Sequence, residues 1–540
     1  MTRRRGAAGL TLAVGRPHIE GTSHRNRVHE TGNPVLKVPR HPPGSTASLP
    51  ALSGKTGGWS RGPVRRLPRL AVMPLRGYRL APKDTYLAVG LTDELISVLS
   101  QIRGLRVISH TSVSQYRGTS KPVAQVGVEL GADSVLSGRV RRSGDQLEVA
   151  VQLVDPTTDH QTWAQTFERP FERVAAIPAE VAESAAGFLN IEVRGAQLDA
   201  IRERPTTNLT AYECYLRGIE AWHRSVSESG DPETLGRVAW ECFEQAIAMD
   251  PRFSAAYASL AHVLLAMMGA NVPTAEVAPR IRELVARALE LDPRSADAHA
   301  AHGNLLGQAD HDWRGSEAAL RMSIALNPSS SIARFWYGGL LLMTQRVRES
   351  RRQYRITVDL DPLWVLPRLN LVWADAWAGS LDAAIAESER TTQRFPERDC
   401  ARVQGAWVYA FAQRRDDALR LVEPWAGTPD PDVRWNPLAV QAYLGQPAPA
   451  RKMLRDWVAG RLSGHLDPVG AAALYALVGE PEPAIELLEK VYHGREFTSW
   501  GDYEAPWYDR IRQDPRCVAL LRAQRLPTTL SRSLMLGAKN

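Results

Sequence analysis

Hydrophobic and polar positions along the chain follow two periods, one typical of strands and one typical of helices. Apolar residues recur at helical spacing in 85–102, after a short apolar run at Leu70–Leu75 that predicts a buried strand. In 146–154 apolar residues at every second position predict a half-buried strand, paired with 134–142 across a short turn. Four more elements are expected, strands at 105–109 and 160–167 and helices at 123–130 and 171–189. This order of elements predicts a small α/β layer.

From about residue 208 onwards the pattern predicts helices only, and the helices repeat. Prolines that close the predicted helix pairs recur with spacings of 42, 35, 34 and 34 residues: Pro251, Pro293, Pro328, Pro362 and Pro396. Five positions before each proline stands a small or short side chain, namely Ala246, Ala288, Ser323, Thr357 or Thr391. A helix–turn–helix period of about 34 residues is that of the tetratricopeptide repeat, TPR. Because one pair cannot bury its apolar face alone, neighbouring pairs are expected to stack into an all-α superhelix.

The patterns divide the chain into four predicted segments: a disordered basic tail at 1–66, an α/β domain at 67–192, a TPR superhelix at 206–527 and a C-terminal tail at 528–540. The N-terminal tail holds seven Pro and ten Gly without hydrophobic periodicity, so it cannot offset the entropy lost on ordering. Ile201–Asn208 is expected to link two halves that each fold alone.

The basic charge of the chain is concentrated in its first 66 residues. The whole sequence of 540 residues carries a formal net charge of +7, but the tail alone holds ten Arg and two Lys against two Glu. The remaining residues are therefore slightly acidic. Binding of nucleic acid by the folded part is not expected.

Cysteine usage and hydropathy indicate the compartment. Four cysteines, Cys214, Cys242, Cys400 and Cys517, show no CxxC spacing, which argues against a disulfide framework or a cysteine zinc site. A reducing compartment fits this usage best. No apolar run approaches the ~20 residues that span a bilayer. We therefore expect a cytoplasmic protein without a membrane span.

Three stretches of the first domain resemble a known module: Leu70–Leu75 (LAVMPL), Gly90–Val113 and Glu129–Arg169. Together they resemble the TolB-N-like module of bacterial signalling proteins, in which TPR repeats follow. The closing stretch Pro506–Arg516 (PWYDRIRQDPR) resembles the Leu-Arg-x-Asp-Pro-Arg-Phe ending of the same proteins. This resemblance extends over 69–527 and implies a TolB-N-like α/β domain followed by a TPR superhelix.

In proteins of this kind an effector usually precedes the module. It is commonly an OmpR-type winged helix, a class III adenylate/guanylate cyclase domain or a Ser/Thr kinase. The tail at 1–66 has no Asp for the metal-binding pair of a cyclase, and the chain has no HRD or DFG pair of a kinase. The tail also lacks the apolar periodicity of a winged helix. The resemblance therefore implies a sensor or interaction half that has lost its effector or works in trans.

The sequence presents no catalytic constellation and no cofactor motif. It has no HExxH helix for a metalloprotease zinc. His299 and His302 lie three apart on one predicted helix face, but their register places them against the second helix of the pair. A third ligand at fixed spacing is missing, so the two histidines are expected to pack in the core. We expect no enzyme activity, no cofactor and no metal.

The first helices of a TPR array line a concave groove. The proline register places eight candidate partner-binding side chains there: His262, Asn304, Gln308, Phe335, Trp373, Trp377, Trp407 and Phe411. This groove begins small and polar and becomes aromatic, with Trp373 and Trp407 at equivalent places in successive repeats. Two interpretations stay open. Degenerate C-terminal repeats curl in and bury the rings, or the rings form a hydrophobic peptide-binding groove.

The sequence favours a non-enzymatic interaction or scaffold module in a bacterial signalling or regulatory pathway, which binds a peptide or protein partner in this groove. One alternative is the sensor half of a transcriptional regulator, whose basic tail touches DNA. Another is an orphaned cyclase-type enzyme. Site-specific DNA binding would favour the first alternative, and nucleotide turnover would favour the second. The identity of the partner and the oligomeric state do not follow from the sequence.

Overall fold

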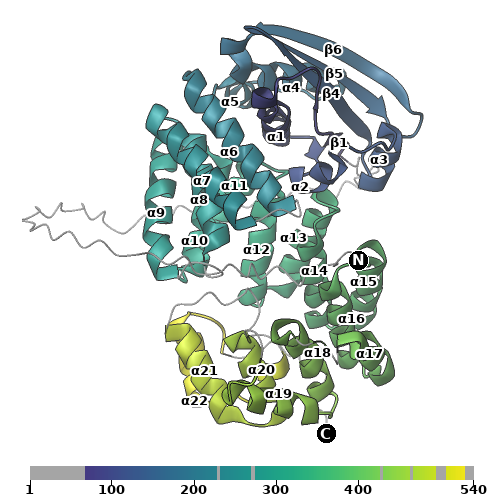
Figure 1. The fold of residues 1–540 in the computed structure, drawn as a ribbon, viewed down its shortest axis with the longest axis vertical. Coiled ribbons are helices and arrows are strands. Elements are labelled where there is room, and N and C mark those ends of the chain that lie inside the picture. Colours follow the sequence, from purple (N-terminus) through teal and green to yellow (C-terminus); the bar gives the residue numbers. More distant parts are fainter. Residues whose placement is uncertain are drawn as a thin grey trace, which may run out of the picture. The chain divides into compact units, whose positions relative to one another are not determined.

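The computed structural model describes residues 67–227, 232–268, 274–425, 428, 430–462, 466–493 and 506–528 (Figure 1). The predicted basic tail at 1–66 lies outside these residues, as does all but the first residue of the C-terminal tail at 528–540. Within the described part, the protein is mostly helical, with one small mixed sheet near its beginning.

The sheet combines parallel and antiparallel pairing. Its strands are β1 (Arg69–Val72), β2 (Arg76–Gly77), β3 (Arg106–Val107), β4 (Ser134–Ser143), β5 (Gln146–Asp155) and β6 (His160–Pro170). The strand order is β3-β1-β4-β5-β6, and β2 pairs with β4 beyond the end of β1. β1 runs parallel to β3 and β4, whereas β4, β5 and β6 form an antiparallel meander in which Val140 faces Val149. The predicted pairing of 134–142 with 146–154 is confirmed.

Five helices accompany the sheet: α1 (Tyr86–Ser100), α2 (His110–Val113), α3 (Val123–Leu130), α4 (Ile177–Phe188) and α5 (Ala196–Arg202). One-turn 3-10 elements lie at Pro82–Asp84 (η1), Ser114–Tyr116 (η2) and Phe171–Ala176 (η3). α1 and α4 pack against each other and against the sheet, and α3 packs on β4 and β5 (Figure 1). The helix predicted at 171–189 is wrong in its first six residues, because Pro178 lacks an N–H and starts the α-helix at Ile177.

The rest of the described chain is helical and consists mostly of antiparallel helix pairs. They begin with α6 (Leu209–Ser227), α7 (Pro232–Met249), α8 (Ser254–Met267), α9 (Thr274–Leu291), α10 (Ala296–Gln308), α11 (Trp313–Leu326), α12 (Ser331–Met343) and α13 (Val347–Leu360). They continue with α14 (Val365–Trp377), α15 (Leu381–Arg394), α16 (Asp399–Phe411), α17 (Arg415–Val422), α18 (Pro431–Tyr443), α19 (Ala448–Val458), α20 (Pro468–Val478), α21 (Pro481–His493) and α22 (Pro515–Ala523). The helices α11, α13, α15 and α17 start 34 residues apart, which confirms the period seen in the sequence.

Small side chains let the two helices of a pair cross closely. The five residues that precede the repeat prolines by five positions, Ala246, Ala288, Ser323, Thr357 and Thr391, are all fully buried. Glycines complete the crossing: a Cβ atom added to Gly338 would lie 2.8 Å from Cε1 of Tyr354, and one added to Gly303 would lie 2.6 Å from Cγ of Leu320. Such separations are shorter than van der Waals contact, so these crossings require glycine.

The α/β domain packs directly on the helix pairs. A Cβ atom added to Gly90 of α1 would lie 2.7 Å from Cδ2 of Leu216 on α6. The backbone N–H of Ser109 donates to the carbonyl of Leu360 over 2.8 Å, and Ser112 donates its hydroxyl hydrogen to Oδ1 of the buried Asp361. Ile201 and Thr206, in the predicted linker 201–208, are buried. The segment between the two halves is therefore packed into the protein.

Candidate functional site

The eight predicted groove residues all lie on the first helices of successive pairs, α8, α10, α12, α14 and α16. These helices contact one another in sequence, so they form one continuous wall. Trp377 is 4% exposed and Trp407 only 1%, and Asn304 is also buried. The other five side chains are half-buried. The wall is therefore largely covered at its aromatic end.

The covering comes from the C-terminal end of the chain. We define the closing segment as residues 506–528, which contain the 3-10 turn η6 (Pro506–Tyr508) and α22. The ring of Trp507 lies 4.8 Å from that of Trp407 and 6.3 Å from that of Trp373, measured between centroids. Trp373 in turn lies 6.1 Å from Trp377 and 5.9 Å from Phe411. These five rings form the aromatic cluster.

Further polar and apolar contacts hold the closing segment on the helix pairs. The indole N–H of Trp313 donates to the carbonyl of Gln524 over 2.8 Å, and Leu521 and Leu526 pack against Met343. Near the other end, the guanidinium of Arg516 makes two hydrogen bonds to the carboxylate of Glu482, over 2.7 and 2.8 Å. The segment thus contacts helices α11, α12, α14, α16 and α21.

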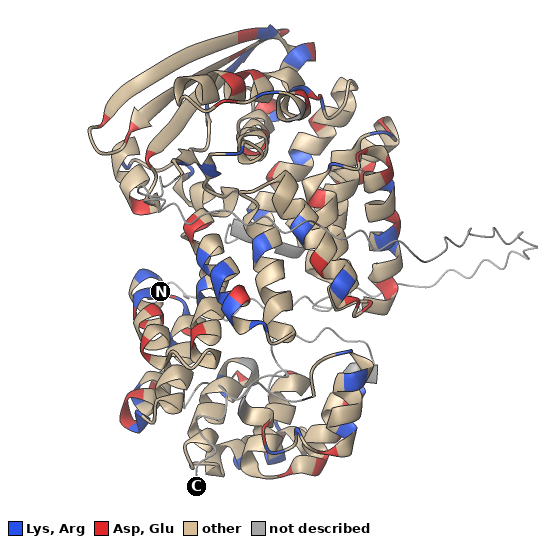
Figure 2. Cartoon of the chain, turned by 180° about the vertical axis from the view of Figure 1, so that it is seen from behind, with Lys and Arg blue, Asp and Glu red and all other residues tan. Residues whose placement is uncertain are grey.

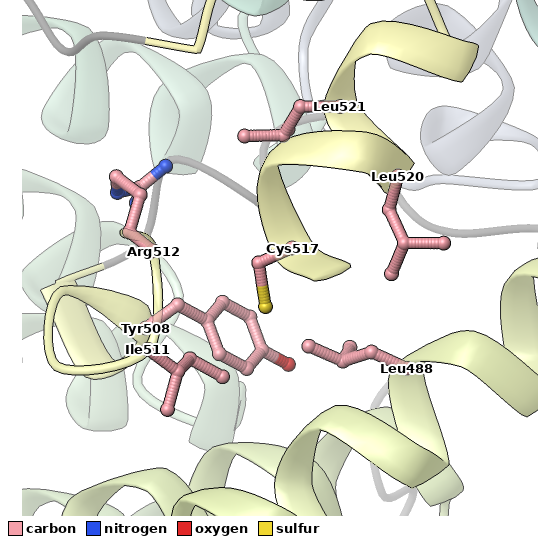
Figure 3. A pocket seen from close by; sticks show the side chains of 7 residues that line it. All are labelled: Leu488, Tyr508, Ile511, Arg512, Cys517, Leu520 and Leu521. Atoms are coloured by element: carbon pink, nitrogen blue, oxygen red, sulfur yellow. The ribbon is translucent and has the colours of Figure 1, made fainter. Parts of the chain in front are cut away.

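Beneath α22 the closing segment encloses a small apolar pocket (Figure 3). Tyr508 and Cys517 line it together with Leu488 of α21, and Figure 3 shows the Cys517 sulfur pointing toward the Tyr508 ring. Burial raises the pKa of the Cys517 thiol to about 11. The thiol is therefore protonated at neutral pH, and it is a poor nucleophile.

The polar end of the wall is separate from the aromatic cluster. The ring of His262 stacks on that of Trp336 with centroids 5.4 Å apart, and its Nε2 lies 3.1 Å from the carbonyl oxygen of Asp297. Phe335 packs on Trp364, with centroids 4.5 Å apart. Gln308 is half-buried on α10. The structure thus brings Trp373, Trp377, Trp407 and Phe411 together, and Phe335 packs against the apolar cluster that contains Trp377. The role of all eight residues in binding a partner stays a prediction.

A group of ionisable side chains lies where α1, α2 and α6 meet. Asp93 comes from α1, His110 begins α2 and His223 lies near the end of α6. The Nε2 atom of His223 lies 2.8 Å from Oδ1 of Asp93, and the rings of His110 and His223 stack with centroids 3.5 Å apart. One donor atom of each residue lies within 4.8 Å of the other two. We call these three residues the Asp–His–His cluster.

The environment of the Asp–His–His cluster fixes its charges. Burial by itself would raise the pKa of Asp93, but the charge of His223 and its hydrogen bond lower the pKa below its usual value. Burial and the charge of His223 lower the pKa of His110 to about 3, so its ring is neutral at neutral pH. Next to it, burial and the charge of Asp93 raise the pKa of Glu94 to about 8. The cluster therefore holds one carboxylate beside a neutral imidazole.

Sequence reasoning did not single out the Asp–His–His cluster. Asp93 and His223 are 130 residues apart, and no spacing rule joins two different domains. His299 and His302, which the sequence did single out, lie on α10, and no third ligand joins them within the described residues. The only local signal was a pair of acidic residues, Asp93 and Glu94, inside an otherwise apolar helix.

A cavity of about 930 Å³ lies in the α/β domain beside this cluster. It is lined by four arginines, Arg76, Arg79, Arg117 and Arg139, and by His110 and Glu220 among others. All four arginines are exposed, and His110 is 7% exposed. On the described helices elsewhere, Lys and Arg are interspersed with Asp and Glu (Figure 2). The cavity thus has a basic rim with a buried histidine at its inner end.

Comparison with known proteins finds relatives for parts of the chain. Residues 66–175 match the family model for the second domain of HilA/YgeH-like transcriptional regulators. A Rhizobium meliloti (strain 1021) protein with the name "Putative adenylate cyclase 3" is 29% identical over 200 residues, which make up 37% of this chain and 33% of that protein. The chain therefore spans about a third of the length of this curated relative.

Some solved structures are similar to parts of the chain. YrrB, described as a TPR protein with an unusual peptide-binding site, is 18% identical and matches 39% of this chain and 99% of its own, with a TM-score of 0.29. TolB from Acinetobacter baumannii is 17% identical and matches 23% of this chain and 28% of its own, with a TM-score of 0.18. The description of the helix pairs therefore rests on the geometry of this chain. No described helix has both the length and the apolar character that crossing a bilayer requires.

Proposed function

We propose that this chain is a non-enzymatic protein-interaction module of a bacterial signalling or regulatory pathway, with a TolB-N-like domain and a TPR superhelix. The partner is a peptide segment with an aromatic anchor, bound on the wall formed by α12, α14 and α16. The observation that supports this proposal is that the ring of Trp507 packs against those of Trp373 and Trp407. A cytoplasmic location fits the four free cysteines.

The closing segment indicates which chemistry the wall accepts. It supplies an indole ring to the aromatic cluster and a backbone carbonyl to the indole N–H of Trp313. Aromatic rings that fill desolvated pockets dominate the binding energy of many interfaces, and backbone hydrogen bonds fix the register. A partner peptide with an aromatic residue would compete for the same place. The closing segment then acts as an intramolecular competitor.

The test uses the full chain and a labelled synthetic peptide that copies residues 506–528. In the wild type the covalently attached segment competes at an effective concentration of about millimolar, so the peptide binds weakly. The Trp507→Ala variant weakens this competitor, and we expect it to bind the peptide about tenfold more tightly by fluorescence anisotropy. Adding Trp373→Ala to that variant should weaken binding by ~30-fold.

The control for this experiment is Trp457→Ala, which removes a half-buried indole from α19. It should leave binding as in the wild type. Absence of peptide binding to the Trp507→Ala variant, with an unchanged circular dichroism spectrum, would contradict the proposal. Equal binding to all variants would show that the peptide binds elsewhere.

A second candidate is the sensor half of a transcriptional regulator or an adenylate cyclase-type protein that acts with a separate effector. The family match of 66–175 to a transcriptional-regulator domain supports it, and so does the name of the Rhizobium relative. Two assays on the purified chain distinguish it from the first proposal. Site-specific DNA binding at high salt would indicate a regulator, whereas nucleotide turnover would indicate a cyclase-type enzyme.

A further inference from the structure

The Asp–His–His cluster has the composition of a transition-metal site. Two imidazoles and one carboxylate are ligands for Zn²⁺ and related cations, whereas Mg²⁺ and Ca²⁺ prefer oxygen alone. The donor atoms of Asp93, His110 and His223 come within 4.8 Å of one another. A tetrahedral ion with ligands at about 2.1 Å holds its donor atoms about 3.4 Å apart. To close the site, the donor atoms therefore have to approach one another by about 1–2 Å, and the stacked rings of His110 and His223 have to turn apart.

The buried histidine has capacity for a ligand. His110 is 7% exposed, and its Nδ1 atom has no hydrogen-bond partner in the described part of the chain. The imidazole nitrogens of His110 and His223 and a carboxylate oxygen of Asp93 are donor atoms of the kind that transition metals take from proteins.

The cluster has a route to solvent. His110 lines the cavity of about 930 Å³ in the α/β domain, together with Thr92 and Glu220. Glu220 precedes His223 by three residues on α6, so both project from the same face of that helix. An ion can therefore reach the cluster through the cavity, and a water molecule in the cavity can complete its coordination.

We propose that Asp93, His110 and His223 bind one divalent transition-metal ion, with Zn²⁺ as the representative, and that this ion ties the α/β domain to α6. Two ligands come from α1 and α2 of the α/β domain, and the third comes from the first helix of the helix-pair array. Binding separates the stacked rings of His110 and His223, because two in-plane lone pairs must converge on the ion. The inference is independent of the proposed peptide function.

Metal binding is measured on the full chain after dialysis against a chelator. Isothermal titration with Zn²⁺ is expected to show one equivalent bound, and the melting temperature should rise, because a ligand that binds only the folded state stabilises it. The variants Asp93→Asn and His223→Gln should each weaken Zn²⁺ binding by about tenfold or more. Their circular dichroism spectra without metal confirm that they fold.

Two matched controls separate this site from others on the chain. His299→Gln removes a half-buried histidine of α10, and Cys242→Ser removes a half-buried thiol of α7. Both should bind Zn²⁺ like the wild type. Failure of the wild type to bind one equivalent would overturn the proposal, and so would equal binding by Asp93→Asn and the wild type.

A spectroscopic measurement keeps the test decisive if the ligand variants do not fold. Co²⁺ bound to Cys242→Ser should give the intense visible absorption of a tetrahedral site with nitrogen and oxygen ligands. The weak absorption of hydrated octahedral Co²⁺ at one equivalent would overturn the proposal. A titration with diamagnetic Zn²⁺ followed by histidine ring NMR should shift the imidazole signals of His110 and His223 most.

Discussion

The indole of Trp507 lies 4.8 Å from that of Trp407, although one hundred residues separate them in the sequence. Trp407 also donates its indole N–H to Oδ1 of Asn436 over 2.6 Å, so its ring is fixed from two sides. The end of the chain therefore occupies the aromatic part of a wall that the repeats build. Any partner that uses these rings has to displace the closing segment.

The two tryptophans should respond differently to truncation. Trp407 is 1% exposed inside the array, so Trp407→Ala should lower the free energy of unfolding by ~3–5 kcal/mol. Trp507→Ala should cost less, because the closing segment can detach while the helix pairs stay folded. Denaturant unfolding followed by circular dichroism measures both. An equal loss for both variants would mean that the closing segment unfolds with the array.

Release of the closing segment should be visible at Cys517. The thiol is buried beside Tyr508, and burial raises its pKa to about 11. In a variant that keeps only this cysteine, labelling by a disulfide reagent at pH 7.5 should be slow. Trp507→Ala should accelerate it several-fold, since the segment then opens more often. Rapid labelling in the unaltered segment would contradict the packing seen in Figure 3.

A methyl group on Gly338 should destabilise the array. The added Cβ would lie 2.8 Å from Cε1 of Tyr354, whose ring is fully buried and cannot move aside. Overpacking of this kind costs ~1–3 kcal/mol. Gly236→Ala is the matched control: nothing lies within 4 Å of its Cβ position on α7, so it should stabilise by up to about 1 kcal/mol. Thermal melts of the two variants should therefore shift in opposite directions.

The contact between the α/β domain and the array should depend on pH through Asp361. Burial raises the pKa of this carboxyl from 3.8 to about 6. Hydrogen bonds from Ser112 and its neighbours act in the opposite direction and lower the pKa, but by less. An acid whose pKa is higher in the folded state contributes its full stabilisation of the fold at pH values below the pKa of the unfolded state. That contribution is lost as the pH rises from about 4 to about 6. The loss amounts to ~3 kcal/mol at most.

The Asp361→Asn variant should lack this loss, because its side chain does not titrate. We expect its stability, relative to that of the wild type, to increase between pH 4 and 6. Urea unfolding at a series of pH values measures the difference. Asp359→Asn is the control, since that carboxylate is half exposed and pairs with Arg106 at the surface. If the stability of Asp361→Asn and that of the wild type changed in parallel with pH, Asp361 would be excluded as the cause of the stability loss between pH 4 and 6.

Local patterns predicted many of the elements correctly. The alternation in 146–154 gave β5, and the helical spacing in 85–102 gave α1 nearly to its ends. The proline register predicted helix starts at intervals of 34 residues and the burial of Ser323 and Thr357. These features depend on residues close in sequence, or on a repeat that translates one local pattern along the chain.

The candidate site was predicted only in part. The register placed Trp373, Trp377, Trp407 and Phe411 on one wall, and the structure brings these rings into contact. The repeat register gave no indication that Trp507 covers these rings. Whether a distant segment covers these rings depends on the direction in which the last helices lead the chain. The degenerate sequence of the last repeats does not predict that direction.

The sequence by itself determined the repeat, the β-meander and the position of each small residue at a helix crossing, because backbone periodicity and side-chain size act over a few residues. Only the tertiary structure decided that Asp93, His110 and His223 meet, and that Trp507 lies against Trp407. Those contacts join elements of different domains, or a repeat helix and a segment one hundred residues further along the chain. Their positions follow from the packing of whole surfaces, which no short segment of the chain encodes.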